Sequence, residues 1–146
     1  MPRYTAPPDL HAALEQRCER VRKPRSTVLF RRGERAFGMF LILRGAVSLD
    51  FGVDCSVGLA NTYGPGALVG LPATLTGRGY SMTATVTDDA ELGFLTAHAV
   101  ESLLREQPEL CQQLLTILSA KIAHTEQLTK ALAHNEKLPR LESGVA

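Results

Sequence analysis

The hydrophobic pattern changes its period twice along this chain, and this change limits the possible folds more than any other feature. Apolar residues recur at helical spacing near the N-terminus, form short runs separated by glycines in the middle, and return to helical spacing afterwards. We therefore expect helices on both sides of a β-rich body. The predicted divisions are an N-terminal helical segment 1–26, a β region 27–96, C-terminal helices 97–137 and a disordered tail 138–146.

The first helix is predicted over residues 9–23, with Asp9 as its N-cap and Pro24 as its end. Its apolar side is marked by Leu10, Leu14 and Val21. A second helix is predicted over residues 97–106 with Thr96 as its cap, and Pro108 opens a third that extends to about residue 135.

Short strands are predicted throughout the middle region. The run 39–43 is apolar throughout and is expected to be buried on both faces, whereas Arg44–Gly45 and Asp88–Asp89 are expected to interrupt strands. Strands of this length and spacing favour a sandwich or a barrel-like jelly roll. The predicted strands are 27–30, 39–43, 46–51, 57–63, 81–86 and 91–95.

Composition excludes several functional classes. The 146 residues fit one domain, and no apolar run approaches the roughly 18 residues of a membrane span. We therefore expect a cytoplasmic protein that does not contact membranes. The formal net charge of +1 gives no argument for nucleic-acid binding. The three cysteines and four histidines form no metal-ligand or catalytic arrangement, so we expect no enzyme, no metal and no cofactor.

Two apolar tracks follow the last predicted helix, which implies a wide buried face. One track is expected to cover the β region and the other to meet a second copy of the chain, and a helix lying in a groove of its own domain is the alternative. Lys121 and His124 interrupt one track, and a position near a ligand pocket is the alternative for them. The predicted dimer interface comprises Leu114, Ile117, Leu118, Lys121, Ile122, His124, Thr125 and Leu128.

The segment 63–85 has the frame of a phosphate-binding cassette. A glycine turn containing Gly66 and Gly70 leads into a short helix, and a strand begins at Tyr80–Ser81. Backbone N–H groups at the start of such a helix favour an anion. Charged side chains are missing from the positions at which a cassette of this kind normally carries them.

The order of these elements resembles the cyclic nucleotide-binding domain of the Crp/Fnr regulators. The resemblance covers about residues 10–132 and rests on the apolar run before Arg44–Gly45–Ala46–Val47, on the cassette glycines and on Pro108–Glu109–Leu110. It implies a mainly β fold with flanking helices, namely a double-stranded β-helix jelly roll followed by a long C-terminal helix that dimerises.

The resemblance also implies a degenerate pocket. The family's ribose-binding glutamate corresponds to Leu71 and its phosphate-binding arginine to Tyr80, and Thr125 lies where the family carries a threonine near the base. Losing one partner of a buried charged pair typically costs about 2–5 kcal/mol. Tight binding of cyclic AMP or cyclic GMP is therefore not expected, although Arg78 is an alternative cation. The candidate pocket residues are Gly66, Gly70, Leu71, Tyr80, Ser81, Met82 and Thr125.

We accordingly expect a sensor or regulatory module in signalling or transcription. The chain stops soon after the long helix, so it is expected to lack the family's helix-turn-helix and to make no direct contact with DNA. The pocket is expected to hold another small molecule or none, and a weak or unorthodox nucleotide site is a further alternative. A ligand-free dimerisation module acting through protein contacts is the alternative function.

Overall fold

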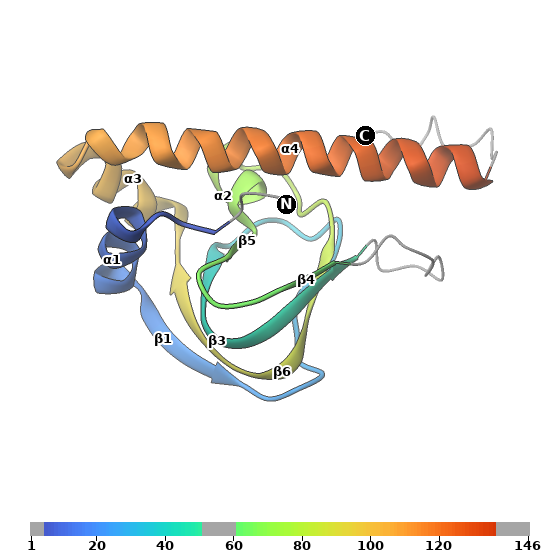
Figure 1. Cartoon of the computed structure of the whole chain (residues 1–146), viewed down its shortest axis with the longest axis horizontal. Coiled ribbons are helices and arrows are strands. Elements are labelled where there is room, and N and C mark those ends of the chain that lie inside the picture. Colours follow the sequence, from blue (N-terminus) through green and yellow to red (C-terminus); the bar gives the residue numbers. More distant parts are fainter. Residues whose placement is uncertain (1–4, 51–60, 137–146) are drawn as a thin grey trace.

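A computed structural model describes residues 5–50 and 61–136, with side chains described as far as Ala123. It is mainly an antiparallel sheet with four flanking helices, which confirms the expected fold class. In Figure 1 the curved strands form a barrel-like body, α1 and α3 lie at one end, and α4 crosses above. The elements are α1 Pro8–Arg17, β1 Glu19–Lys23, β2 Val28–Phe30, β3 Met39–Asp50, β4 Asn61–Tyr63, β5 Leu68–Val69, α2 Leu71–Thr76, β6 Thr83–Leu95, α3 Ala97–Glu106 and α4 Glu109–Glu136.

Two long strands, β3 and β6, form the centre of the sheet. They pair from Met39 opposite Leu95 to Asp50 opposite Thr83, and the main sheet order is β1-β6-β3-β4. The short strands β2 and β5 pair with β6 and β3. The sequence prediction of shorter strands was wrong here, because β3 continues through Arg44–Gly45 and β6 continues through Asp88–Asp89.

Gly45 explains why β3 continues where a break was predicted. The register shifts between Ile42 and Val47, and Gly45 has a φ of +86°, which L side chains rarely adopt. A Cβ atom there would lie 2.4 Å from the Asp89 carbonyl oxygen. The glycine therefore lets β3 bend against β6 without losing the pairing.

The N-terminal helix is shorter than predicted. α1 ends at Arg17, Cys18 is extended, and residues 19–23 form β1, which pairs with β6. Arg20 reinforces this placement by binding the carboxylates of Glu91 on β6 and Glu15 on α1, at 2.9 and 2.6 Å. The barrel therefore begins within the predicted N-terminal helical segment. Asp9 lies in the first turn, and Pro7 occupies the N-cap position.

The remaining boundaries lie close to prediction. α3 has the expected bounds, and the Thr96 hydroxyl accepts a hydrogen bond from the Ala99 N–H at 3.1 Å. α4 begins at Glu109, one residue after Pro108. Only Asn61–Tyr63 of the strand predicted over 57–63 falls within the described residues, and the predicted tail 138–146 lies outside them.

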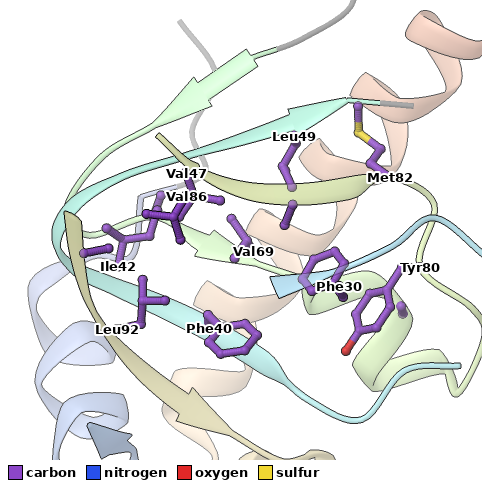
Figure 2. Packing of buried hydrophobic residues seen from close by; sticks show 14 residues of the cluster. Phe30, Phe40, Ile42, Val47, Leu49, Val69, Tyr80, Met82, Val86 and Leu92 are labelled. Carbon is purple, nitrogen blue, oxygen red and sulfur yellow. The ribbon is translucent and has the colours of Figure 1, made fainter. Parts of the chain in front are cut away.

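Two hydrophobic clusters lie on opposite faces of β3. Side chains alternate across a strand, so Met39 and Leu41 join one cluster and Phe40 and Ile42 join the other. All four are buried, which confirms that this run is covered on both faces. The barrel cluster, inside the curved sheet (Figure 2), comprises Phe30, Phe40, Ile42, Val47, Leu49, Ala67, Val69, Ala73, Tyr80, Met82, Ala84, Val86, Ala90 and Leu92. The helical cluster comprises Ala6, Leu10, Ala13, Leu14, Met39, Leu41, Leu68, Leu71, Leu95, Val100, Leu103, Leu110, Leu114 and Ile117.

Candidate functional site

A small cavity lies at the edge of the barrel cluster, beneath α2 and α4. Its volume is about 40 Å³. One water molecule needs about 10–15 Å³ on this scale, whereas sites for drug-sized ligands occupy about 300–1,000 Å³. This inner cavity therefore has room for a small chemical group but not for a nucleotide. It is lined by Phe30, Leu49, Tyr63, Gly70, Pro72, Ala73, Tyr80, Ser81, Met82 and Lys121.

Gly70 positions one wall of the inner cavity. It follows β5 directly and caps α2 with a φ of +88°. A Cβ atom there would lie 3.3 Å from the Gly38 carbonyl oxygen and from ring carbons of Phe30 and Tyr80. Only glycine gives both this backbone conformation and this close approach without displacing a neighbour.

Tyr80 closes a second side of the inner cavity and has a structural role. Its ring stacks on Phe30, with centroids 3.7 Å apart (Figure 2). Its hydroxyl donates to the Gly38 carbonyl oxygen at 2.6 Å and accepts from the N–H groups of Phe37 and Gly38 at 3.0 and 3.2 Å. Burial raises the pKa of this phenol, so it stays neutral at physiological pH. Tyr80 thus uses its hydroxyl to bind the backbone rather than a ligand.

Lys121 brings a cation into the inner cavity from α4. The residue is 6% exposed, and its ammonium lies over the Tyr63 ring, 5.2 Å from the centroid. Such an approach is favourable because the ring face is electronegative. Burial away from water lowers the pKa of Lys121 to about 8. At neutral pH the cavity therefore contains a buried positive charge, at a residue predicted as a dimer contact with a position near a ligand pocket as the alternative.

The candidate pocket residues from the sequence divide into three groups. Gly70, Tyr80, Ser81 and Met82 line the inner cavity. Gly66 and Leu71 do not line it, because Leu71 packs in the helical cluster and the Gly66 N–H donates to the Ile42 carbonyl oxygen in a turn. The Thr125 side chain lies outside the described part of the structure.

Phe30, Leu49 and Tyr63 line the inner cavity but were not among the predicted pocket residues, whereas a position near a ligand pocket was one of the two alternatives given for Lys121. Phe30 and Leu49 come from strands whose alternating pattern marks their inward-facing positions, and this signal could have been used. Tyr63 and Lys121 meet only because β4 and α4 lie on either side of the cavity. No local sequence pattern connects these two residues.

A second hollow adjoins the inner cavity on the outside, between α2 and α4. This outer cleft has a volume of about 360 Å³ and shares Pro72, Ala73 and Ser81 with the inner cavity. Arg78 lies on its wall, as does Ile122 of α4, which is 40% exposed. Arg78 therefore faces the outer cleft and is not among the residues that line the inner cavity.

The two predicted tracks of α4 have different environments. Leu114 and Ile117 are buried in the helical cluster and Lys121 faces the inner cavity, so these residues have little surface for a second copy of the chain. Their assignment to a dimer interface is corrected on this ground. Leu115 and Ile122 are exposed, and Leu118 packs partly on the helical cluster. The side chains of His124, Thr125 and Leu128 lie beyond the described side chains.

Within the described ranges, no group of three or more His, Cys, Asp or Glu side chains is arranged to hold a metal ion. Among the described residues, no helix combines the length and the hydropathy needed to cross a bilayer.

Curated relatives cover most of this chain. Mouse patatin-like phospholipase domain-containing protein 7 is 32% identical over 107 residues, which are 73% of this chain and 8% of the mouse protein. The global nitrogen regulator of Nostoc sp. is 32% identical over 127 residues, which are 82% of this chain and 55% of the regulator. The chain thus spans a small part of the first relative and about half of the second.

Comparison with solved structures supports the fold. A protein of a cyclic-GMP-dependent signalling pathway that regulates bacterial phytopathogenesis superposes with a TM-score of 0.75 at 22% identity, covering 83% of this chain and 97% of that one. The sequence model of the cyclic nucleotide-binding domain family matches residues 20–107, which is more than half of the 146 residues. This chain therefore belongs to the cyclic nucleotide-binding domain family.

Proposed function

We propose that this chain is a non-enzymatic sensor domain, acting in the cytoplasm, whose pocket no longer accepts cyclic AMP or cyclic GMP tightly. The observation that carries this proposal is the inner cavity of about 40 Å³. A cyclic nucleotide is far larger, and it also needs a counter-charge for its phosphate and an acceptor for its ribose hydroxyl.

The residues at the two expected contact positions support the same proposal. Tyr80 stands where the resemblance places the phosphate-binding arginine, and its hydroxyl is already bonded to the backbone of residues 37 and 38. Leu71 stands where the resemblance places the glutamate, and it packs into the helical cluster with no exposed surface. Admitting a nucleotide would require Tyr80 to leave its stack on Phe30.

Isothermal titration calorimetry with cyclic AMP and cyclic GMP tests this proposal. We expect a Kd above about 1 mM for either nucleotide, because losing a buried charged partner costs about 2–5 kcal/mol. Micromolar binding of either one, with displacement of the Tyr80 ring resonances in NMR spectra, would show that the cavity opens and that the proposal is wrong.

We also propose that α4 joins two copies of the chain and passes the regulatory signal between them, without direct contact with DNA. Leu115 is 48% exposed and Ile122 is 40% exposed, and they lie seven residues, or about two helical turns, apart on the same side of α4. Exposed apolar residues in such a row favour a helix–helix contact with a second copy.

Sedimentation equilibrium tests the dimer proposal. Leu115→Glu is expected to weaken self-association at least 10-fold, because it places a charge in an apolar contact. Thr116→Glu is the matched control, since Thr116 is exposed on the opposite flank of the buried face. Equal association of both variants and the wild type would contradict the proposal.

A dimerisation module without any ligand is the second candidate function. The exposed row on α4 and the small inner cavity both favour it. A thermal-shift screen of small molecules separates the two functions, because a module without a ligand would be stabilised by none of them.

A further inference from the structure

A hollow with several basic side chains lies at the surface of the sheet, where β1, β6 and β3 are neighbours (Figure 1). Its volume is about 460 Å³, which is within the range of about 300–1,000 Å³ of typical ligand sites. Among the described residues it shares no lining residue with the inner cavity or the outer cleft, so it is a separate site. This basic hollow is lined by Arg22, Lys23, Pro24, Arg44, Asp89, Ala90 and Glu91.

The register of the strands brings two arginines to the basic hollow from opposite sides. Glu91 of β6 lies opposite Arg22 of β1 and also opposite Arg44 of β3. Paired strands are about 4.8 Å apart, so the backbones of Arg22 and Arg44 lie about 10 Å from each other across β6. Lys23 follows Arg22 at the end of β1 and adds another cation to the lining.

A β-bulge turns Arg44 towards the basic hollow. Regular alternation would place Arg44 on the same side of β3 as Ile42, whose side chain belongs to the barrel cluster. The register shifts between these two residues, however, and Arg44 is exposed and lies opposite Glu91. Bulges that redirect a side chain are common beside functional sites. The irregular pairing therefore supplies an arginine that regular pairing would have directed into the barrel.

The two carboxylates of the basic hollow already have partners. Glu91 binds the Arg20 guanidinium at 2.9 Å, and the Asp89 carboxylate accepts a hydrogen bond from the Arg25 backbone N–H at 2.8 Å. Arg20 and Arg25 are not among the described residues that line the hollow. Because Arg20 neutralises Glu91, Asp89 supplies the remaining negative charge.

The cations of the basic hollow outnumber this remaining charge. Among the side chains that the structure describes, Arg22, Lys23 and Arg44 form no ion pair. Arg22 and Arg44 are exposed, and Lys23 is half-buried. Since the whole chain has a formal net charge of only +1, this excess of positive charge is local. It favours an anionic partner at this surface.

Separate carboxylates suit the basic hollow better than a row of phosphates. Each arginine can hold a carboxylate through two parallel hydrogen bonds. Duplex DNA carries one negative charge per about 1.7 Å of its axis and is bound by extended basic stripes. Asp89 and Glu91 lie between the cations and repel phosphates at such a spacing, whereas single acidic side chains can each approach one cation.

We propose that the basic hollow docks a short acidic segment of a partner protein, whose carboxylates bind Arg22, Lys23 and Arg44. The docking goes beyond the proposed sensor function and does not depend on whether the inner cavity holds a ligand. No described residue of α4 lines the basic hollow, so this surface is separate from the proposed dimer contact.

An NMR titration of the isotope-labelled full chain with two peptides tests the charge requirement. The probes are N-acetylated, C-amidated Gly-Glu-Asp-Glu-Gly and its uncharged counterpart Gly-Gln-Asn-Gln-Gly. We expect the acidic peptide to bind at low salt with a Kd of about 1 mM or lower and the uncharged one to bind at least about 10-fold more weakly. The amide resonances of residues 22–24, 44 and 89–91 should shift. Equal affinity for the two peptides, or no binding of the acidic one, overturns the inference.

Two double variants of equal charge locate the contact. Arg22→Gln with Arg44→Gln is expected to weaken binding of the acidic peptide at least about 5-fold, because both cations of the proposed contact are lost. Arg78→Gln with Arg105→Gln removes two exposed arginines that do not line the basic hollow, and it is expected to weaken binding less than about 2-fold. Equal weakening in both double variants would show general charge attraction and overturn the inference.

A mixed-sequence DNA duplex separates an acidic partner from nucleic acid. Fluorescence anisotropy near physiological salt is expected to give a Kd above about 10 μM for the duplex, in the range of non-specific binding. Tighter binding that Arg22→Gln with Arg44→Gln abolishes would assign the basic hollow to nucleic acid and overturn the inference.

Discussion

The barrel cluster and the helical cluster are built from different residues although they share the two faces of β3. The helical cluster contains only aliphatic side chains and methionine, and it holds α1, α3 and α4 on the sheet. The barrel cluster contains stacked aromatic rings, borders a cavity and meets the buried ammonium of Lys121. Close-packed aliphatic side chains give stability, whereas a cavity with a buried charge costs stability and provides a place for ligand chemistry.

The prediction with the largest expected effect concerns the packing of α4 in the helical cluster. Leu114→Ala removes a side chain that is 1% exposed, and the cavity left behind is expected to lower the free energy of unfolding by about 2–5 kcal/mol. Urea denaturation at a concentration at which the chain is monomeric measures this change. Leu115→Ala, at a position that is 48% exposed, is the matched control and is expected to cost less than about 1 kcal/mol. Similar costs at both positions would contradict the contrast between the two faces of α4.

The second prediction concerns the cost of the charge beside the barrel cluster. The folded-state pKa of Lys121, about 8, lies below its ordinary value of 10.5, so the unfolded chain binds more protons between these pH values and stability rises with pH across them. Below pH 8, Lys121→Met is expected to be more stable than the wild type by about 3 kcal/mol, because each pKa unit corresponds to about 1.4 kcal/mol.

Denaturation of both proteins at pH 7 and at pH 10.5 checks this prediction. The difference in unfolding free energy between the variant and the wild type is taken at each pH. This difference cancels the contribution of the other groups that titrate in this range, including the neighbouring Tyr63 and Tyr80. The advantage of Lys121→Met is expected to shrink towards zero at the higher pH. An advantage of the same size at both pH values would show that it arises from packing and not from the charge.

The third prediction tests the role of Tyr80 in the barrel cluster. Tyr80→Phe keeps the ring on Phe30 but removes the oxygen that accepts the Phe37 and Gly38 N–H groups. Leaving buried polar groups without a partner is expected to cost about 1–3 kcal/mol in thermal or urea denaturation. Amide resonances of residues 37 and 38 should shift as well. A cost below about 0.5 kcal/mol would mean that the hydroxyl is free to serve a ligand.

The smallest expected effect concerns α2, which lies beside the inner cavity. The Thr74 hydroxyl oxygen is buried and has no hydrogen-bond partner among the described residues. Thr74→Val has nearly the same shape, and it is expected to stabilise the chain by about 1 kcal/mol because it removes a desolvated polar group. Thr76→Val is the control and is expected to destabilise the chain. It removes a hydrogen bond that the exposed Thr76 hydroxyl donates to the Pro72 carbonyl oxygen at 2.7 Å. Equal changes in both variants would contradict this interpretation.

The sequence predicted the kinds of element better than their extents. Apolar periodicity located α3, α4 and the double-sided burial of residues 39–42, because these signals are local. It failed at residues 19–23, where β1 forms because β6 offers backbone partners and Glu91 binds Arg20. It also failed at Gly45, where a local break signal becomes a bend within a long paired strand.

The candidate site was predicted in part. Gly70, Tyr80, Ser81 and Met82 were identified and do line the inner cavity. Leu71 was not placed correctly, because its position in the cassette does not reveal that the first turn of α2 points it into the helical cluster. Lys121 was predicted as a dimer contact, with a position near a ligand pocket as the alternative, and the sequence could not decide between them because the direction in which α4 presents it depends on how the helix lies on the barrel.

The sequence by itself determined the family and the β-rich body between helices, because each of these depends on residue identity and spacing. Only the tertiary structure decided that Tyr80 bonds to the backbone, that the inner cavity is small and that it holds a cation. These features arise from residues far apart in the chain, Tyr63 and Lys121 above all, which meet where strands and helices pack together. Contacts of this kind depend on the packing of the whole domain, and no local pattern encodes them.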